Sequence, residues 1–384
     1  MNVCLVYHAG AMQSARHIYG ALARLGNVDL TVIVPQKVKV GRVYDPSGWL
    51  CVEREEESNG YRLLPVPLRN PLNSWQGFES EILRRHIKRI QPDITHVLDE
   101  PNSGYLMQVV WLRLTACPRS KVLFYGFDNL PLGRAKRFRR MKWRLTWAQL
   151  AGGVAANSES LENLKQLGFP RNRPLERIFW GISTDIFKPM DSLVLKKELG
   201  LDCEKIVGFI GRLTPEKGLT VLLAAMRRLP LEVHCLIIGS GPSRTELELW
   251  SALPELSGRV HLYDVMQPEG LANHTNCMDV LVLPSLTTPQ WKEQYGRVLG
   301  EAMACGVPVV GSDSGAIPEV IGPAGLIVPE GDPSALAEAA RTAIFDREAR
   351  ERFRQRGLQR VEEELSTTAM AQRLLNFYIR LLGA

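Results

Sequence analysis

The first half of the chain alternates short apolar runs with amphipathic helical patterns. A helical pattern over residues 14–26, ending at Gly26, separates the first two runs. The apolar runs, each ending in polar residues, proline or glycine, cover 3–10, 29–35, 93–100, 121–128 and 152–160. Alternation of strands and helices predicts a parallel sheet with helices on both faces. Residues 36–75 follow this pattern less well, and the charged stretch 53–58 is interpreted as a solvated loop.

The second half repeats the pattern more clearly. A helical pattern over 218–229 follows the first apolar run, and another over 368–384 closes the chain. The predicted strands lie within 205–213, 232–241, 278–285, 307–315 and 325–332. We therefore predict an α/β protein with two doubly wound parallel-sheet domains that face each other across a cleft.

The stretch 177–189, which ends in Pro189, reads as the link between the two halves. We place an N-terminal, acceptor-binding domain at 1–185 and a C-terminal, nucleotide-binding domain at 186–367. Residues 368–384 form the last helix, whose apolar positions need a surface to cover, and we expect it to return to the first domain.

Length and composition agree with a two-domain globular protein. The chain has 384 residues, of which 45% are hydrophobic. No apolar run reaches about 18 residues, so we expect no membrane-spanning helix. The start of the chain shows no secretion leader, and the seven cysteines are scattered without metal-ligand spacing. We expect a cytoplasmic protein with free thiols.

The charge is unevenly distributed along the chain. Residues 1–190 contain 27 Lys and Arg against 16 Asp and Glu, whereas residues 191–384 contain 20 against 25. The first half is therefore expected to meet an acidic partner. Seven of its basic residues fall between 134 and 144, with aromatic and apolar residues among them.

Two interpretations of the segment 134–147 remain open. It has the composition of an amphipathic helix that lies on an anionic membrane, with tryptophan at the level of the headgroups. It could equally be an ordinary basic helix whose aromatic residues face the core. The first interpretation makes the protein peripheral on the inner face of the membrane. Nucleic acid is not expected as a partner, because no nucleic-acid module surrounds the segment.

The polar residues that could carry chemistry follow predicted strands. Ligands of open parallel sheets sit beyond the carboxyl ends of the strands, where loops and helix N-termini meet. Such positions include Gly10, Arg212, Lys217, the GSG turn at 239–241, and Glu293 with Glu301.

Glu293 and Glu301 stand eight positions apart around a predicted helix start. Eight helical residues rise about 12 Å, so the two carboxylates are too far apart to share a metal. They could instead accept hydrogen bonds from the two ends of a nucleotide sugar. Its diphosphate would lie at the helix N-terminus, and Arg212 and Lys217 would add positive charge. Taken singly, each residue has a simpler interpretation: Glu293 as a helix cap, Glu301 on a solvated helix face, and Lys217 as a surface residue.

Three stretches in the right order resemble a known family. GRLTPEKG (211–218), VLVLPS (280–285) and EQYGRVLGEAMACGVPVVGSDSGAIPEVIG (293–322) resemble the C-terminal domain of retaining family 4 glycosyltransferases. The resemblance extends over most of 150–332. It implies the GT-B fold, in which two Rossmann-like domains face a cleft, and transfer of a sugar from a nucleotide donor to an acceptor hydroxyl.

The resemblance also assigns roles to residues. Arg212 and Lys217 would neutralise the leaving diphosphate, Glu293 would bind sugar hydroxyls, and Glu301 would bind the ribose. Many members have a histidine in the N-terminal domain that contacts the donor sugar; here the loop reads FYGFDNLP, and Asp128 is the candidate. The catalytic candidates are Arg212, Lys217, Glu293 and Asp128. The donor-binding candidates are Gly10, Gly211, Arg212, Lys217, Gly239, Gly241, Val265, Glu293, Tyr295, Gly296, Arg297, Val298 and Glu301.

No D-x-D pair ends a predicted strand, so we expect no metal and no cofactor other than the donor, with UDP or GDP preferred to ADP. In the front-face mechanism that the resemblance implies, an oxygen of the leaving group assists the incoming hydroxyl of a sugar or lipid-linked acceptor, in polysaccharide or glycoconjugate biosynthesis. Three alternatives stay open. They are a nucleotide-sugar epimerase of the same architecture, a non-catalytic membrane-associated scaffold, and a dehydrogenase, although the glycine fingerprint of the last is incomplete.

Overall fold

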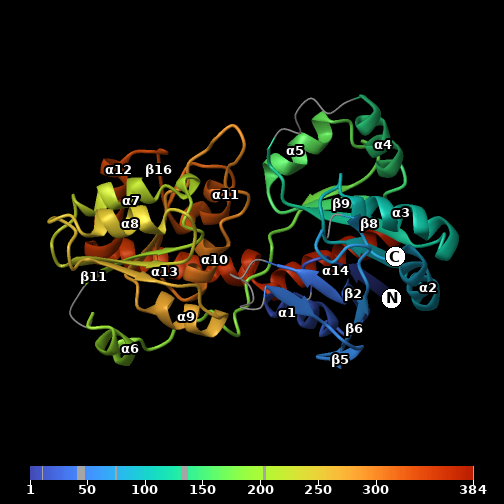
Figure 1. Ribbon diagram of the computed structural model, residues 1–384, viewed down its shortest axis with the longest axis horizontal. Helices are drawn as coiled ribbons and strands as arrows, with labels where there is room; N and C mark the ends of the chain where they lie inside the picture. Colours follow the sequence, from blue (N-terminus) through green and yellow to red (C-terminus); the bar gives the residue numbers. More distant parts are fainter. Residues whose placement is uncertain (11, 41–47, 74–75, 131–136, 202–204, 384) are drawn as a thin grey trace. The chain divides into compact units, whose positions relative to one another are not determined.

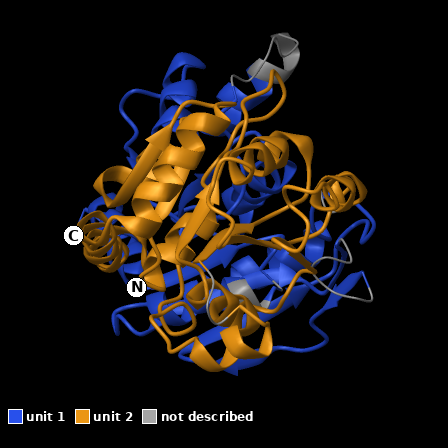
Figure 2. Ribbon diagram, turned by 90° about the vertical axis from the view of Figure 1, so that its left-hand side faces the viewer, with its two compact units in different colours: residues 1–181, 367–384 blue, residues 182–366 orange. Residues whose placement is uncertain are grey.

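The structure is a computed structural model that describes residues 1–384 except 11, 41–47, 74–75, 131–136, 202–204 and 384. The chain forms two compact units, one made of residues 1–181 and 367–384, the other of residues 182–366 (Figure 2). The first unit thus combines the two ends of the chain. The sequence instead predicts a first domain that ends at residue 185, and it treats the last helix, 368–384, as a separate segment.

The first unit is built on an eight-stranded sheet. In spatial order its strands are β10 (Leu175–Arg177), β9 (Gly152–Ala155), β8 (Lys121–Gly126), β7 (Ile94–Val97), β1 (Asn2–Val6), β2 (Asp29–Pro35), β6 (Tyr61–Val66) and β5 (Glu56–Ser58). All neighbours are parallel except β5 and β6, which are antiparallel. The central strands are almost wholly buried and mostly apolar, as is typical of strands covered on both faces. A separate antiparallel pair joins β3 (Lys37–Lys39) to β4 (Trp49–Cys51).

Several helices belong to the same unit. They are α1 (Gln13–Ala23), α2 (Ser80–Ile90), α3 (Gly104–Ala116), α4 (Arg137–Trp147), α5 (Ser158–Gln166) and α14 (Thr367–Leu382). The last helix buries Met370, Leu374, Phe377 and Tyr378 and packs against α1 (Figure 1). Its apolar stripe is thereby covered, as the periodicity of the sequence requires.

The second unit has a six-stranded, fully parallel sheet. Its strands, in spatial order, are β13 (Val260–Tyr263), β12 (Val233–Ile238), β11 (Lys205–Ile210), β14 (Val280–Leu283), β15 (Val309–Ser312) and β16 (Gly325–Val328). Its helices are α6 (Leu193–Glu198), η2 (Pro215–Lys217), α7 (Leu219–Met226), α8 (Arg244–Ser251), α9 (Pro268–Asn276), α10 (Arg297–Ala304), α11 (Ile317–Ile321), η3 (Gly322–Ala324), α12 (Pro333–Phe345), α13 (Arg347–Arg360) and η4 (Val361–Leu365). Figure 1 shows α7, α8 and α12 on one side of the strands and α9 on the other. The predicted α/β class with two parallel sheets is confirmed.

The interpretation of 53–58 as a loop is wrong for its second half. Residues Glu56–Ser58 form β5, which pairs antiparallel with β6 at the edge of the first sheet. An edge strand has one free side in water, so its charged side chains remain solvated while its backbone pairs. The rule that apolar runs mark strands fails at such an edge.

The basic segment is helical where the structure describes it, but its tryptophans do not face outward. Residues 134–136 lie outside the described residues, and α4 covers the rest. Trp143 and Trp147 are buried in the apolar core, and the Trp147 indole N–H donates to the carbonyl of Pro101 at 2.8 Å. The expectation that a tryptophan of this helix lies at the level of the lipid headgroups is therefore wrong.

Six cysteines that the structure describes are free, and of these only Cys51 is exposed. Within the described ranges, every helix is too short or too polar to cross a bilayer.

A buried polar contact joins the last helix to the first sheet. His96 on β7 has no exposed surface, and its Nδ1 lies 2.7 Å from the hydroxyl of Tyr378 on α14. Burial disfavours the charged imidazolium and lowers the pKa of His96 from 6.5 to about 3.

This histidine makes the first unit sensitive to acid. Between the ordinary pKa of 6.5 and the folded value of about 3, the unfolded chain binds a proton that the folded chain does not. The free energy of unfolding should therefore fall as the pH drops through this window, by up to about 1.4 kcal/mol per pH unit from this one group. Urea unfolding across the window measures it. His96→Gln should flatten the pH dependence, whereas His17→Gln, a substitution at a partly exposed position on α1, should preserve it. An equally steep dependence in His96→Gln would contradict the assignment.

Candidate functional site

Polar residues gather in the second unit where adjacent strands end. Arg212 and Lys217 follow β11, Ser285 follows β14, and the loop after Ser285 leads to Glu293. Strands β11 and β14 are neighbours in the sheet, so their carboxyl ends bring these loops together. The sequence-predicted residues Arg212, Lys217 and Glu293 therefore belong to one edge of one sheet.

A buried ion pair forms the centre of this edge. The Lys217 ammonium lies 2.5 Å from Oε2 of Glu293, and the Ser285 hydroxyl donates to the same oxygen at 2.9 Å. Only 12% of the Lys217 side chain and 9% of the Glu293 side chain are exposed. The Lys217 ammonium also lies over the ring of Trp291, 4.8 Å from its centroid. Lys217 is thus not the surface residue that it could be taken for in isolation.

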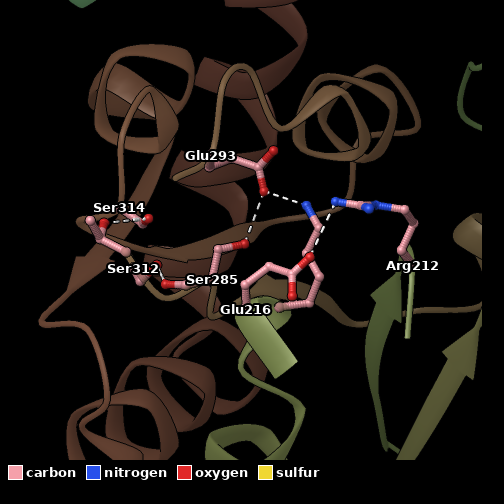
Figure 3. A network of polar contacts seen from close by, with 8 residues as sticks. Arg212, Glu216, Ser285, Glu293, Ser312 and Ser314 are labelled. Carbon is pink, nitrogen blue, oxygen red and sulfur yellow. Dashed lines mark hydrogen bonds and ion pairs between the residues drawn. The ribbon is translucent and has the colours of Figure 1, made fainter. Parts of the chain in front are cut away.

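Arg212 lies in a more open environment beside this pair. Its side chain is 56% exposed and its guanidinium contacts Glu216, four residues further along the chain, at 3.3 Å. Figure 3 shows the Arg212 guanidinium turned toward Glu216 and the Glu293 carboxylate next to Ser285. An exposed guanidinium next to a buried ammonium is suited to an anion that enters from solvent.

Three glycines allow the loops to approach this closely. Gly218 has φ of +67°, and a Cβ there would lie 1.9 Å from the carbonyl oxygen of Pro284. A Cβ on Gly239 would lie 1.9 Å from the oxygen of Gly211, and one on Gly241 would lie 2.3 Å from the oxygen of Leu213. The GSG turn therefore packs directly on the backbone that precedes Lys217. Its glycines are explained by this packing without any ligand.

A second set of hydrogen bonds fixes the loop that leads to Glu293. The Thr287 hydroxyl contacts Ser314 at 3.0 Å and Glu330 at 2.5 Å. The Ser312 hydroxyl donates to the carbonyl of Ser285 at 2.5 Å (Figure 3). These contacts join the ends of β14, β15 and β16. The loop is consequently anchored on both sides of the position from which Ser285 reaches Glu293.

Helix α10 begins later than the sequence interpretation assumes. Gly296 caps it with φ of +73°, and the first helical residue is Arg297. Glu293 therefore lies in the preceding loop, and the rise of eight helical residues does not apply to the two glutamates. Glu301 is buried within α10, where its carboxylate lies 2.7 Å from Nε of Arg297. The alternative that Glu301 faces solvent is wrong.

The remaining donor-binding candidates of the second unit lie around these residues. Tyr295 is buried, and burial raises the pKa of its hydroxyl. Val298 is half-buried in the first turn of α10, and Val265 is exposed in the loop after β13. The N-terminus of a helix such as α10 favours a bound anion through its dipole and its first backbone N–H groups.

Two candidates belong to the first unit. A Cβ on Gly10 would lie 2.6 Å from the hydroxyl of Tyr19, so packing alone requires a glycine there. Asp128 accepts a hydrogen bond from the backbone N–H of Leu130 at 3.1 Å. Its own N–H donates to Glu100, as does that of Phe127. Burial raises the pKa of Glu100 to about 7.

The sequence interpretation missed several partners at these sites. Ser285, Glu216, Trp291 and Glu100 all contact candidate residues or their loops. Ser285 and Glu100 could have been proposed, because each follows the carboxyl end of a predicted strand. Nothing in the local pattern separates Trp291 from an ordinary loop aromatic.

Comparisons with known proteins find similarity in sequence and in fold. The sequence model of the family described as Glycosyl transferases group 1 matches residues 193–360. The D-inositol 3-phosphate glycosyltransferase of Mycobacteroides abscessus is 35% identical over 158 residues, which are 39% of this chain and 34% of the relative. The alpha-maltose-1-phosphate synthase of Mycolicibacterium smegmatis is 32% identical over 217 residues, 52% of this chain and 54% of the relative. The chain thus spans about a third to a half of the length of these curated relatives.

The fold extends the similarity to the whole chain. HepE of Anabaena, solved in complex with UDP, superposes with a TM-score of 0.76, covering 98% of this chain and 99% of HepE at 17% identity. At that identity the likeness concerns the fold alone. Residues 193–360 of this chain thus match the family described as Glycosyl transferases group 1, and the chain as a whole has the GT-B fold.

Proposed function

We propose that this chain transfers a sugar from a nucleoside diphosphate donor to an acceptor hydroxyl, with retention of configuration and without a metal. The observation that carries the proposal is the buried Lys217–Glu293 pair with the exposed Arg212 beside it. Two cations and one carboxylate within one sheet edge match a ligand that joins a diphosphate to a hydroxylated ring. The relatives reported above are named as a transferase and a synthase, which favours transfer over epimerisation.

The donor would be held from several sides. Arg212, Lys217 and the N-terminus of α10 would bind the diphosphate and stabilise it as it leaves. Glu293, already oriented by Ser285 and Lys217, would accept hydrogen bonds from the sugar, and Glu301 from the ribose. Gly211, Gly239, Gly241 and Val265 would border the base. Retention and metal independence rest on the family resemblance, in which protein cations neutralise the leaving group.

The nucleotide and the acceptor are proposed by class. The proposed donor base is UDP or GDP ahead of ADP, and HepE, which was solved with UDP, supports the first of these. The acceptor would be a sugar or a lipid-linked hydroxyl in polysaccharide or glycoconjugate biosynthesis, bound by the first unit. There Asp128 would be positioned by the backbone contacts of its loop to Glu100.

A membrane surface would be a second partner. On α4, Met141 and Leu145 are exposed next to Lys142 and Arg144. This combination of exposed apolar and basic side chains supports binding to an anionic bilayer on the cytoplasmic side. The buried tryptophans would take no part in it.

Nucleotide sugars should raise the melting temperature of the protein. In a panel of UDP-, GDP- and ADP-sugars, the UDP or GDP compound should give the largest thermal shift. Glu301→Ala should weaken binding of that compound about tenfold or more by calorimetry, because a charged hydrogen-bond acceptor is lost. Glu338→Ala, at an exposed carboxylate on α12, is the matched control. Normal donor affinity in Glu301→Ala would remove Glu301 from the site.

Lys217→Ala should reduce turnover more than stability. Loss of a charge that stabilises the leaving group should lower kcat by about 10²-fold or more. Because the substitution also leaves the Glu293 carboxylate without its cation, the double variant Lys217→Ala/Glu293→Gln tests folding without a buried charge. Lys205→Ala, at the amino end of β11, should retain activity. Normal sugar transfer by Lys217→Ala would show that this edge is not the active site.

The membrane partner can be tested by flotation. The protein should float with liposomes that contain anionic lipid, and less so at high salt, because the attraction is screened. Met141→Ser/Leu145→Ser should float less, whereas Leu249→Ser, at an exposed position on α8, should behave like the wild type. Absence of wild-type binding would end the membrane proposal.

A further inference from the structure

Three cations surround one aspartate at the amino edge of the second sheet. Lys196 comes from α6, Lys205 is the first residue of β11, and Arg350 comes from α13. Asp279 lies directly before β14, the neighbour of β11 in the sheet. The distances from its carboxylate oxygens are 3.6 Å to the Lys196 ammonium, 3.5 Å to the Lys205 ammonium and 3.6 Å to the Arg350 guanidinium. Four segments of the second unit thus bring their charges together.

The aspartate at the centre is buried and fixed by the sheet. Only 11% of its side chain is exposed, and its Oδ2 accepts a hydrogen bond from the backbone N–H of Ile206 at 3.0 Å. The N–H of Asp279 donates in turn to the carbonyl of Ile206 at 2.8 Å. The carboxylate is therefore held by β11 itself, and its charge attracts the three cations to a fixed place.

One carboxylate does not satisfy the donors of three cations. Each cation lies at an ion-pair distance from Asp279, beyond the roughly 2.7–3.2 Å of an N–H···O hydrogen bond. Their side chains donate no hydrogen bond to any residue that the structure describes. Arg259 of the same unit shows the contrast, because its guanidinium donates to five backbone carbonyls. The donors of the cluster are therefore open to an acceptor that enters from solvent.

Charge and exposure favour an anion as this acceptor. The four side chains carry three positive charges and one negative charge, which leaves an excess of two positive charges. The cations are reachable from water, since 16% of the Lys196, 39% of the Lys205 and 44% of the Arg350 side chain are exposed. An anion from solvent thus meets the cations more readily than the covered carboxylate.

We propose that these three cations bind a phosphate group and that Asp279 holds them in place. The ligand class is inorganic phosphate or a phosphate monoester, because its charge of about −1.5 to −2 at pH 7 matches the excess of two positive charges. The Arg350 guanidinium supplies a planar fork for two phosphate oxygens, and the two lysines supply mobile point charges.

The phosphate site is separate from the candidate donor site. Strand β11 has six residues, so its two ends are about 17 Å apart. Lys205 stands at its amino end, whereas Arg212 and Lys217 follow its carboxyl end. The phosphate site therefore stands whether or not the chain transfers sugar.

Phosphate binding by the full chain can be measured directly. Sodium phosphate should raise the melting temperature more than sodium chloride does at the same ionic strength, because only phosphate binds the folded site. By calorimetry, Lys205→Gln/Arg350→Gln should weaken phosphate binding about tenfold or more through the loss of charge-assisted hydrogen bonds. Arg227→Gln is the matched control, since the Arg227 side chain is also 44% exposed but pairs with Glu255 alone. It should keep the wild-type affinity.

Asp279→Asn should change phosphate binding in the opposite direction. The amide oxygen can still accept from the N–H of Ile206, while the one negative charge of the cluster is removed. Phosphate should therefore bind about threefold more tightly or better. Without phosphate, the variant should melt at a lower temperature than the wild type, because the cations lose their counter-charge. An ion cluster with a structural role alone predicts the second effect and not the first.

Three results would overturn the site. They are equal melting temperatures in phosphate and chloride, wild-type phosphate affinity in Lys205→Gln/Arg350→Gln, and loss of phosphate binding in Arg212→Gln alone, which would move the phosphate to the donor site.

Two further probes identify the source of the phosphate group. Binding of glucose 6-phosphate that Lys205→Gln/Arg350→Gln loses assigns the site to a soluble phosphate ester. Flotation with liposomes containing phosphatidic acid that the same variant loses assigns it to a lipid headgroup. Binding of inorganic phosphate without either leaves the free ion as the ligand.

Discussion

The ion pair between Lys217 and Glu293 is the contact on which the second unit's candidate site depends. Both side chains are almost wholly buried. Two charged groups that are removed from water are stable only when they pair with each other and make further hydrogen bonds. Ser285 supplies one such bond, and the ring of Trp291 covers the ammonium. An interaction of this kind adds little net stability. Its effect is to hold one cation and one carboxylate in a fixed relation, which is what binding a charged, hydroxylated ligand requires.

The backbone makes this pair possible. Lys217 and Glu293 are 76 positions apart in the chain, but β11 and β14 are adjacent in the sheet. Gly218 allows the turn after β11 to touch Pro284, and the GSG turn packs on Gly211 and Leu213 at the start of the same turn. The parallel topology therefore determines which loops meet, and the glycines determine how closely they meet.

The first unit handles its buried polar groups differently. His96 stays neutral because burial lowers its pKa, and its partner Tyr378 comes from the far end of the chain. Glu100, three residues past β7, has a pKa raised by burial and holds the loop of Asp128 through backbone N–H groups. Asp99 instead faces a partly exposed imidazole. In this unit a tyrosine hydroxyl and backbone N–H groups meet buried polar side chains, whereas the second unit pairs a buried ammonium with a buried carboxylate.

The sequence alone determined the α/β class, most buried strands and the family of the second unit, because apolar runs, helical periodicity and glycine-rich loops are local patterns. Tertiary structure decided what depends on distant neighbours. The charged segment Glu56–Ser58 forms a strand because its backbone pairs with β6. Trp143 is buried because it packs into the apolar core of the first unit. Helix α10 starts after Gly296, so Glu293 meets Lys217 from a loop. Strand pairing and the burial of charged side chains depend on residues that are distant in the chain, so the local periodicity of the sequence does not predict them.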